Sequence, residues 1–257
     1  EGLVEISKEF FSTSDYDLKE GVYLSDFKND YQPLVKYRES SDNPYGLNPE
    51  ASTTVKVNKI DEVAGPIFVE DILELNFVNK KNHSELGGLS LALVLNETIY
   101  RDGVPVSVDE DVLYDYATEI AGPKLESYLR KKAELANVPI VIGVFVVDKE
   151  NDSVPGKYIA KAKYENRQGQ FTKMNQYWLI FPTANARLLD ATTDAKILSL
   201  QKSVSDWLPV DIGIIGYGEY IDAQLSRLKI SVNVQTKTFT EILALTNHVG
   251  ESIVSFD

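Results

Sequence analysis

Cysteine is absent from this sequence of 257 residues, which has only two histidines and one methionine. The lack of cysteine excludes a disulfide framework, a thiolate zinc site, an iron–sulfur cluster and a cysteine nucleophile. Neither histidine, His83 or His248, has a metal-binding residue four positions before or after it. We therefore expect neither a bound transition metal nor a cofactor.

Long apolar runs are also missing, and so is an initiating methionine. No stretch approaches the roughly 20 apolar residues that cross a bilayer as a helix, and no signal peptide is recognisable. The chain begins with Glu1, so we expect that a segment upstream has been removed. An anchor in that segment would be compatible with a membrane location.

Positive charge is in the minority. Lysine and arginine total 26 against 39 aspartate and glutamate residues, which gives a formal charge of −13. Nucleic-acid binding draws on lysine and arginine contacts to phosphate, so this balance argues against a nucleic-acid partner. The densest basic run, Lys124–Lys132, lies on a predicted helix and also contains Glu126. Its mixed charge is typical of a solvated helix face.

The composition is that of a folded globular protein, with 43% hydrophobic and 25% charged residues. A chain of this length buries about 70–75% of its unfolded surface, so it needs no covalent staple. Residues 1–65 are rich in turn-forming stretches and also carry five tyrosines, which argues against disorder. We expect an irregular N-terminal strap over 1–65 and an α+β body over 66–257.

Periodic hydrophobic residues predict alternating strands and helices. A spacing of three to four predicts a helix, and short apolar or alternating runs predict strands. Phe68, Ile72 and Leu75 favour a helical start for 67–78, with a strand as the alternative. Gly122-Pro123 is expected to kink or split the longest helix. The predicted helices are 2–11, 107–135, 190–208 and 240–248, and the predicted strands are 89–95, 139–147, 157–164, 177–181, 212–215, 227–234 and 253–256.

The order strand, helix, strand, strand occurs twice, within 86–164 and 177–257. After each main helix the sequence has the form Pro-x-x-Ile-Gly, which ends at Gly143 and at Gly213. These features indicate two pseudo-repeats, in which the two glycines would be equivalent, or a shared architecture alone. The whole pattern predicts an α+β protein with mainly antiparallel sheets and helices packed on one face.

Motifs that resemble catalytic or phosphate-binding sites each lack an essential part. Ser90 lies inside an apolar run, whereas a serine hydrolase needs its nucleophile at a sharp strand-to-helix turn. Gly216-Tyr-Gly218 lacks the third glycine of a phosphate loop and indicates a bulge or tight turn. The acidic run 148–152 lacks the glycine and glutamate of a calcium loop. We predict no catalytic residue, although a chain with 39 acids always brings some carboxylate pair close.

Tyrosines concentrate in the first 50 residues. Tyrosine-rich clefts bind sugars and peptides, and the seam between a strap and a sheet body leaves grooves. Tyrosine among acidic residues is also typical of a strap that packs on a core. The candidate ligand groove is formed by Tyr16, Tyr23, Tyr31, Tyr37 and Tyr45.

Several short segments, built of glycine, proline and strand residues, carry a family resemblance through their joint order. They are Gly2–Lys8, Glu20–Leu24, Gly46–Pro49, Leu86–Asn96, Asn137–Gly143, Val154–Tyr158 and Ile214–Gly218. Together they resemble the CamS family, the sex-pheromone precursor lipoproteins of Gram-positive bacteria. None of them is a catalytic motif, and the turns at 46–49 and 154–156 are the most telling.

The resemblance implies a precursor whose signal peptide ends in a lipidated cysteine, so that the mature protein is anchored on the outer face of the cell membrane. It also implies that a peptide cut from the signal segment acts as a conjugation pheromone. This chain would then be the extracytoplasmic body. The resemblance supplies no catalytic, cofactor-binding or metal-binding residue for that body.

Three classes of function are open to the body. We expect a non-enzymatic binding or scaffold module, whose partner is a peptide, a cell-wall fragment or a surface protein. The alternatives are a cell-wall or peptide hydrolase that uses a carboxylate pair, and a purely structural carrier of the signal peptide. A ligand-sized cleft favours binding, a buried carboxylate or Ser–His pair in a cleft favours hydrolysis, and a pocket-free surface favours a carrier.

Overall fold

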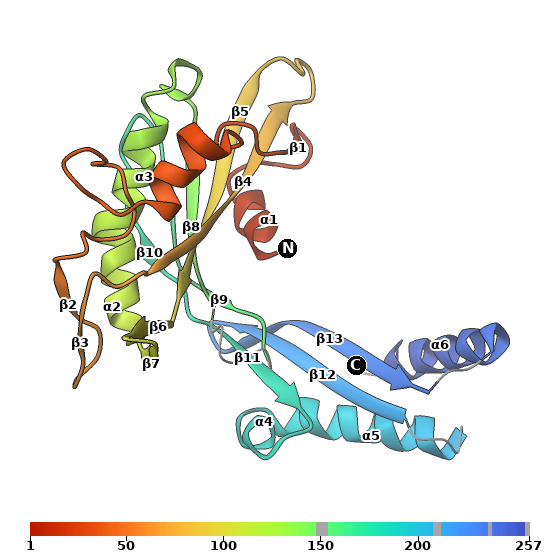
Figure 1. Cartoon of the computed structure of the whole chain (residues 1–257). Coiled ribbons are helices and arrows are strands. Elements are labelled where there is room, and N and C mark those ends of the chain that lie inside the picture. Colours follow the sequence, from red (N-terminus) through yellow and green to blue (C-terminus); the bar gives the residue numbers. More distant parts are fainter. Residues whose placement is uncertain (148–153, 208–211, 236–237, 255–257) are drawn as a thin grey trace. The chain divides into compact units, whose positions relative to one another are not determined.

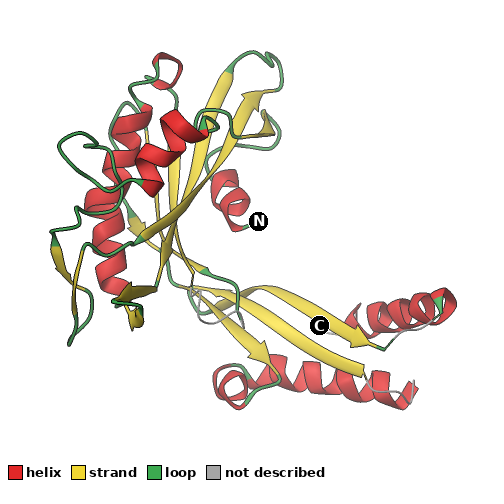
Figure 2. Cartoon of the chain, viewed as in Figure 1, coloured by secondary structure: helices red, strands yellow, loops and turns green. Residues whose placement is uncertain are grey.

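The computed structural model describes residues 1–147, 154–207, 212–235 and 238–254. The chain forms two compact units, Glu1–Met174 (unit 1) and Asn175–Asp257 (unit 2). Each unit has its own sheet and hydrophobic core (Figure 1), and helices and strands are mixed in both (Figure 2). The α+β class and the mainly antiparallel pairing are confirmed, while a division at residue 65 stays a prediction.

Unit 1 is built on a six-stranded sheet with the order β1-β4-β5-β8-β9-β10. Strands β5 and β8 are parallel, and all other neighbours in this sheet are antiparallel. A parallel pair needs a crossover connection, which the helices between β5 and β8 supply. The strands are β1 (Tyr16–Glu20), β4 (Val69–Asn79), β5 (Leu86–Asn96), β8 (Ile140–Val147), β9 (Lys157–Tyr164) and β10 (Thr172–Lys173).

The crossover begins with a hairpin and continues as a helical run. Pro123 lies just after η2, where it has no N–H to donate to a carbonyl of the preceding turn. The predicted break at Gly122-Pro123 therefore coincides with a change from π-helical to α-helical geometry. The elements are β6 (Thr98–Arg101), β7 (Val104–Ser107), α2 (Glu110–Asp115), the π-helical η2 (Tyr116–Ala121), α3 (Gly122–Leu129) and the short η3 (Ala133–Leu135).

Strand β5 is buried on both faces because alternate side chains point to opposite sides of a sheet. Leu91 and Leu93 belong to the main core with the α2–α3 crossover. Ala92 belongs to a second cluster with Leu3 and Ile6 of α1 (Gly2–Lys8). Full burial of each leucine contributes about 1.5–3 kcal/mol. Helices α2 and α3 thus cover one face, and α1 covers part of the other (Figure 1).

Side-chain hydrogen bonds fix the first 65 residues to unit 1. The amide of Asn48, which is 1% exposed, donates to the Val69 carbonyl at 2.9 Å and accepts from the Val69 N–H at 2.8 Å. The Glu74 carboxylate accepts from the N–H groups of Val22 at 2.9 Å and Leu24 at 2.7 Å. The other elements here are the π-helical η1 (Phe27–Lys36), β2 (Thr54–Lys56) and β3 (Glu62–Ala64).

Unit 2 is an antiparallel sheet with the order β11-β12-β13 and helices on one face. Phe181 of β11 packs with Ile197 of α5. Ile214 of β12 packs with Leu200 of α5 and Leu245 of α6. The elements are β11 (Gln176–Phe181), α4 (Ala184–Leu189), α5 (Ala191–Trp207), β12 (Ile212–Ile221), β13 (Gln224–Val234) and α6 (Phe239–Val254).

Two predicted elements differ in the structure. Residues 69–79 form a strand, so the favoured helical start is wrong and the strand alternative is confirmed, because β4 hydrogen-bonds to β1 on one side and β5 on the other. Those ladders override the helical spacing of Phe68, Ile72 and Leu75. The predicted strand at 253–256 is wrong over its described part, since α6 continues to Val254. The other predicted helices and strands are present, with β12 and α6 longer than predicted.

The two pseudo-repeats share an order of elements but not a strand arrangement. Strand β5 is parallel to β8, whereas β11 is antiparallel to β12. Gly143 pairs with Ala92 on one side and Lys161 on the other, while Gly213 pairs with Asn233 of β13. Superposed units would need the same strand directions, so the predicted equivalence of Gly143 and Gly213 is wrong.

Candidate functional site

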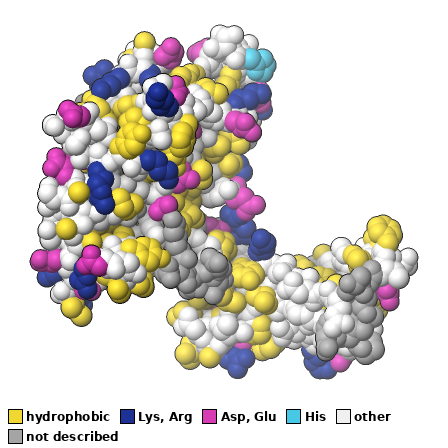
Figure 3. All heavy atoms as spheres, viewed as in Figure 1, with side chains coloured by type: hydrophobic (Ala, Val, Ile, Leu, Met, Phe, Trp, Pro, Cys, Tyr) yellow, Lys and Arg dark blue, Asp and Glu magenta, His cyan; other side chains and the backbone are white. Residues whose placement is uncertain are grey.

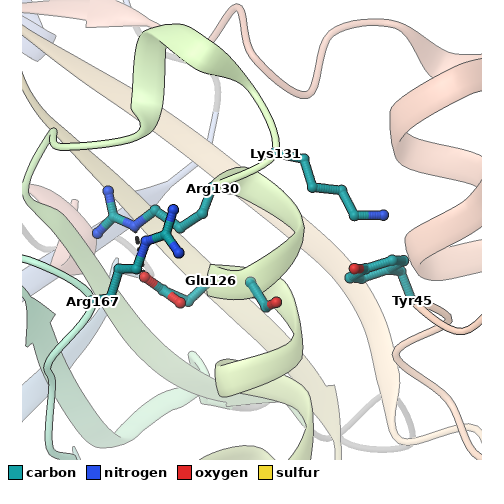
Figure 4. A pocket seen from close by; sticks show the side chains of 6 residues that line it. Tyr45, Glu126, Arg130, Lys131 and Arg167 are labelled. Atoms are coloured by element: carbon teal, nitrogen blue, oxygen red, sulfur yellow. Dashed lines mark hydrogen bonds and ion pairs between the residues drawn. The ribbon is translucent and has the colours of Figure 1, made fainter.

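A pocket of about 270 Å³ lies at the end of α3 in unit 1 (Figure 4). Its walls come from the loop after η1, the last turn of α3 with the residues directly after it, and the turn after β9. Pockets that enclose a drug-sized ligand measure roughly 300–1,000 Å³, so this one suits a small molecule or one end of a larger one. The lining residues are Tyr45, Glu126, Ser127, Arg130, Lys131 and Arg167.

Arg130 is the buried cation of the pocket, with a side chain that is 4% exposed. Its Nε donates to Glu126 Oε1 at 2.6 Å, one helical turn earlier. Its Nη1 donates to the carbonyls of Leu135 and Val138, both at 2.6 Å. Helix α3 ends at Leu129, and the chain then turns so that these carbonyls face the guanidinium. Within the described part of the chain, Nη2 is buried and has no hydrogen-bond partner.

Arg167 reaches the pocket from a tight turn. The backbones of Glu165 and Gln168 hydrogen-bond in both directions at 2.9 Å. The two residues between them, Asn166 and Arg167, have φ values of 51° and 64°. Asparagine and glycine tolerate this region, whereas it costs other residues about 1–2 kcal/mol. The Arg167 side chain is exposed, and among the described residues no hydrogen bond or ion pair holds it.

Lys131 and Tyr45 form the other end of the pocket (Figure 4). The Lys131 Nζ lies 3.5 Å from the centroid of the Tyr45 ring, a cation–π contact. Tyr45 packs edge-on against Tyr128 with 5.5 Å between centroids, and the Tyr128 hydroxyl donates to Asp30 at 2.7 Å. Burial and then the bond to Asp30 raise the pKa of Tyr128 well above its ordinary value. Tyr128 therefore stays a neutral donor at physiological pH.

The pocket is electropositive within an acidic chain. Glu126 is its single lining acid, and the ion pair with Arg130 neutralises it. Lys131 and Arg167 have no ion pair within the described ranges. Elsewhere on the visible face of unit 1, basic and acidic side chains are interspersed (Figure 3). Charges beyond about 8 Å are screened at physiological ionic strength, so the positive charge of the pocket acts locally despite the total of −13.

The prediction of a solvated face for Lys124–Lys132 is wrong for its central residues. Glu126 and Arg130 are each 8% exposed, and Lys132 pairs with Asp30 at 2.7 Å. Mixed charge on a helix predicts exposure, but no sequence pattern locates the carbonyls that draw Arg130 inward. The one signal for Arg167 is the preceding asparagine between two short runs, which is typical of a two-residue hairpin turn.

Four of the five predicted groove tyrosines lie on two faces of the sheet. Tyr16 packs with the α1 cluster. Tyr23, Tyr31 and Tyr45 pack against the main core on the opposite face. Tyr37 is 52% exposed after the end of η1. Of these five residues Tyr45 alone lines the described pocket, and ligand binding by the other four stays a prediction.

The remaining sequence motifs serve the fold. Ser90 is fully buried inside β5, away from any exposed turn. Gly216 and Gly218 lie within strand β12, where a Cβ on Gly218 would come within 2.9 Å of the Phe181 ring. The alternative of a tight turn is therefore wrong, whereas the alternative of a bulge has a counterpart in the register shift of β12 directly after them, between Glu219 and Tyr220. The acidic run 148–152 lies outside the described residues.

A Ser–His contact joins α5 and α6 in unit 2. Ser203 Oγ lies 3.3 Å from His248 Nε2, and the Trp207 ring stacks on the imidazole at 4.7 Å between centroids. A hydrolytic triad also needs a group that orients the histidine. In the described part of the chain no carboxylate hydrogen-bonds to this ring. Ser203 lies within helix α5, so the contact is one of helix packing.

Carboxylates with shifted pKa values act as helix caps. Side-chain and backbone hydrogen bonds with Asn29 lower the pKa of Asp26. Burial acts to raise the pKa of Asp190, but hydrogen bonds from Thr193 and Tyr220 together lower it. A general acid needs a raised pKa, which neither group has. Among the described residues, no group of three or more His, Cys, Asp or Glu side chains could hold a metal ion.

Residues 1–256 match the family described as CamS sex pheromone cAM373 precursor, a description that names no enzymatic activity. The crystal structure of a sex pheromone precursor from Lactobacillus salivarius subsp. salivarius UCC118 aligns with a TM-score of 0.81 and 27% identity, over 99% of this chain and 75% of that chain. No curated protein matches this chain.

Two further structures share the fold. The C-terminal domain of sex pheromone staph-cAM373 precursor from Staphylococcus aureus aligns with a TM-score of 0.80 and 19% identity, over 99% of this chain and 83% of that chain. A structure of sex pheromone staph-cAM373 precursor aligns with a TM-score of 0.51 and 17% identity, over 98% of this chain and 77% of that chain. Across the described ranges, no helix is both long and apolar enough to cross a membrane.

Proposed function

Because this chain belongs to the CamS sex pheromone cAM373 precursor family, we propose that it is the extracytoplasmic body of a lipid-anchored precursor. In this proposal a signal peptide upstream ends in a lipidated cysteine, and a peptide from the signal segment serves as the pheromone. The body is held on the outer face of the cell membrane. The support for this proposal is the family match over residues 1–256.

The body itself is a non-enzymatic binding module. The observation that carries this part is the cationic pocket at the end of α3, with Arg130 buried and Lys131 and Arg167 unpaired within the described residues. Arginine and lysine side chains carry several N–H donors and no acceptor, so these groups can hold an anion but offer no base. They therefore suit recognition better than acid–base chemistry.

The proposed partner is a peptide, a cell-wall fragment or a surface protein. The pocket of about 270 Å³ accepts only one end or one side chain of such a molecule, and the rest would lie along the surface of unit 1. Nucleic acid is a poor partner because a formal charge of −13 repels a long polyanion.

The anchoring part is tested on the full-length precursor in a Gram-positive host. Mass spectrometry of the membrane fraction is expected to find a lipid-modified N-terminal cysteine on the mature protein. Replacement of that cysteine by serine is expected to release the body from the membrane. A body that leaves the membrane unmodified in the parent strain would contradict this part.

The non-enzymatic part is tested by incubating the purified chain with peptidoglycan fragments and short peptides. Chromatography with mass detection is expected to recover the substrates unchanged. Reproducible turnover that disappears when one carboxylate is replaced would overturn this part in favour of a hydrolase.

A further inference from the structure

The pocket at the end of α3 contains hydrogen-bond donors that the described residues leave without an acceptor. We propose that it binds a single oxyanionic group, a carboxylate or a phosphate, at the end occupied by Arg130 and Arg167. The group is carried by a small molecule or by the end of a larger one. This inference rests on the proposed binding function and names its ligand chemistry.

Arg130 supplies the buried half of the site. Arginine has five N–H donors in a planar fork, and here Nε and Nη1 are occupied by Glu126, Leu135 and Val138. Nη2 is buried with no partner among the described residues. An unpaired buried donor costs about 1–3 kcal/mol, and more when it is charged. Because Nη2 has almost no solvent-accessible surface, Arg130 acts on an oxyanion in the open pocket through its positive charge rather than through a bond from that atom.

Arg167 supplies the exposed half. Both arginines line the same pocket, and Figure 4 shows their guanidinium groups at the same end of it. The ion pair with Glu126 offsets the charge of Arg130, so Arg167 supplies the accessible and uncompensated charge for an anion. Arg167 also has a φ of 64°, where glycine would lie without strain. The turn thus places a guanidinium at a position that the backbone alone would assign to glycine.

The other lining residues limit what fits. Ser127 adds a hydroxyl donor, and Lys131 over the Tyr45 ring adds a third cation. A volume of about 270 Å³ holds one charged group with a few attached atoms. The acidic remainder of the chain disfavours long polyanions by repulsion. The site therefore selects a compact anion rather than a highly charged polymer.

The test is isothermal titration calorimetry on the whole chain with two separate probes, inorganic phosphate and N-acetylalanine. N-acetylalaninamide is the control that lacks the carboxylate. We expect one molecule of an oxyanion to bind per chain, more weakly at higher salt, and the amide not to bind. Binding of phosphate alone identifies a phosphate-bearing ligand, and binding of N-acetylalanine alone identifies a carboxylate-bearing one.

The variant Arg167→Gly removes the cation and suits the turn. It is expected to weaken binding about tenfold, the effect of one charged hydrogen bond, with an unchanged or raised Tm. Lys81→Ala removes an equal charge from the exposed turn between β4 and β5. Ala223→Gly relieves the same kind of strain at a φ of 62° without a change of charge. Both controls are expected to bind like the parent chain.

Two results overturn the inference: neither oxyanion binds, or Arg167→Gly binds as well as the parent chain. Either of them leaves the lipidation result of the precursor untouched, so the anchoring proposal would stand alone. The opposite combination is also distinguishable. If Arg167→Gly weakens oxyanion binding but the precursor is not lipidated, the pocket proposal is supported and the anchoring part is rejected.

Discussion

Arg130 ends α3 and forms part of the pocket at the same time. Its bonds to the carbonyls of Leu135 and Val138 hold the chain that leaves the helix. Its partner Glu126 has a side chain only 10% exposed. Bringing both charges out of water is costly, so loss of one partner harms stability more than loss of the pair.

We predict that Arg130→Met lowers the free energy of unfolding by about 3–5 kcal/mol, because it leaves the Glu126 carboxylate buried and unpaired. Glu126→Leu in the same chain is expected to restore part of this loss. The measurement is urea denaturation followed by circular dichroism. The matched control is Arg101→Met, whose pair with Asp61 is exposed at 46% and 27% and is worth less than about 1 kcal/mol. Equal costs for both arginines would contradict the prediction.

Buried tyrosines make unit 1 sensitive to alkali. Burial, and then the charge of Glu126, raises the pKa of Tyr164 to about 12, against an ordinary value of about 10. As the pH rises, the Tyr164 hydroxyl therefore stays protonated to a higher pH in the folded state than in the unfolded state. The contribution to stability is therefore complete below about pH 10 and is lost as the pH rises towards about 12.

We predict that Tyr164→Phe reduces the loss of stability between about pH 8 and about pH 11. Tyr37→Phe, at a ring that is 52% exposed, is the control and is expected to change this loss little. Urea denaturation at both pH values measures the difference for each chain. The prediction fails if the two variants lose as much stability on going to alkaline pH as the parent does.

At the scale of elements, the N-terminal segment is an integral part of unit 1. Leu3 and Ile6 of α1 pack beneath the sheet, and β1 pairs with β4 along its edge. Leu34 and Leu47 are fully buried in the main core. We predict that a chain without residues 1–50 loses the cooperative unfolding of unit 1 and its amide NMR dispersion. A truncated chain with the dispersed spectrum of the parent would contradict this.

Elements that one local pattern determines could be predicted from the sequence. The apolar run 89–95 predicts a buried strand, which β5 is. The helical spacing of Phe68, Ile72 and Leu75 gave a wrong prediction. Strand β4 is extended because it pairs with two neighbouring strands, and such pairing cannot be recognised from the residues of one short segment. The parallel pairing of β5 with β8 could not be predicted, since it depends on how the crossover packs across the sheet.

The site was less predictable than the fold. The sequence shows Arg130 and Lys131 as part of a charged helical run. Whether each side chain is buried depends on where α3 ends and on the path of the chain after it. Arg167 is 37 residues further along the chain than Arg130 and reaches the pocket from a turn. Tyr45 was predicted as a binding residue, although among other tyrosines that lie elsewhere. Residues gathered from three separate segments of the chain leave no common spacing in a sequence.

At the scale of the molecule, two separate cores predict two unfolding steps. Leu93 is fully buried in unit 1 and Ile197 in unit 2. We predict that Leu93→Ala lowers the transition of unit 1 alone and Ile197→Ala that of unit 2 alone, each by about 2–5 kcal/mol. Differential scanning calorimetry of the whole chain separates the two transitions. A single transition that both changes shift equally would show that the units unfold together.

The acidic balance of the chain and its cationic pocket have complementary effects. A formal charge of −13 keeps the molecule soluble and repels polyanions. The pocket concentrates positive charge over a short distance, where screening leaves it effective. In the proposed function, the acidic surface disfavours polyanions and the pocket supplies local positive charge for a compact anion.

The central claim is that this body recognises a compact oxyanion at the end of α3. The most direct measurement is an amide NMR titration of the assigned whole chain with inorganic phosphate and with N-acetylalanine. Saturable shifts are expected to concentrate at Tyr45, at residues 126–131 and at Arg167, and to diminish in Arg167→Gly. Saturable shifts located elsewhere, or none with either anion, would contradict the claim.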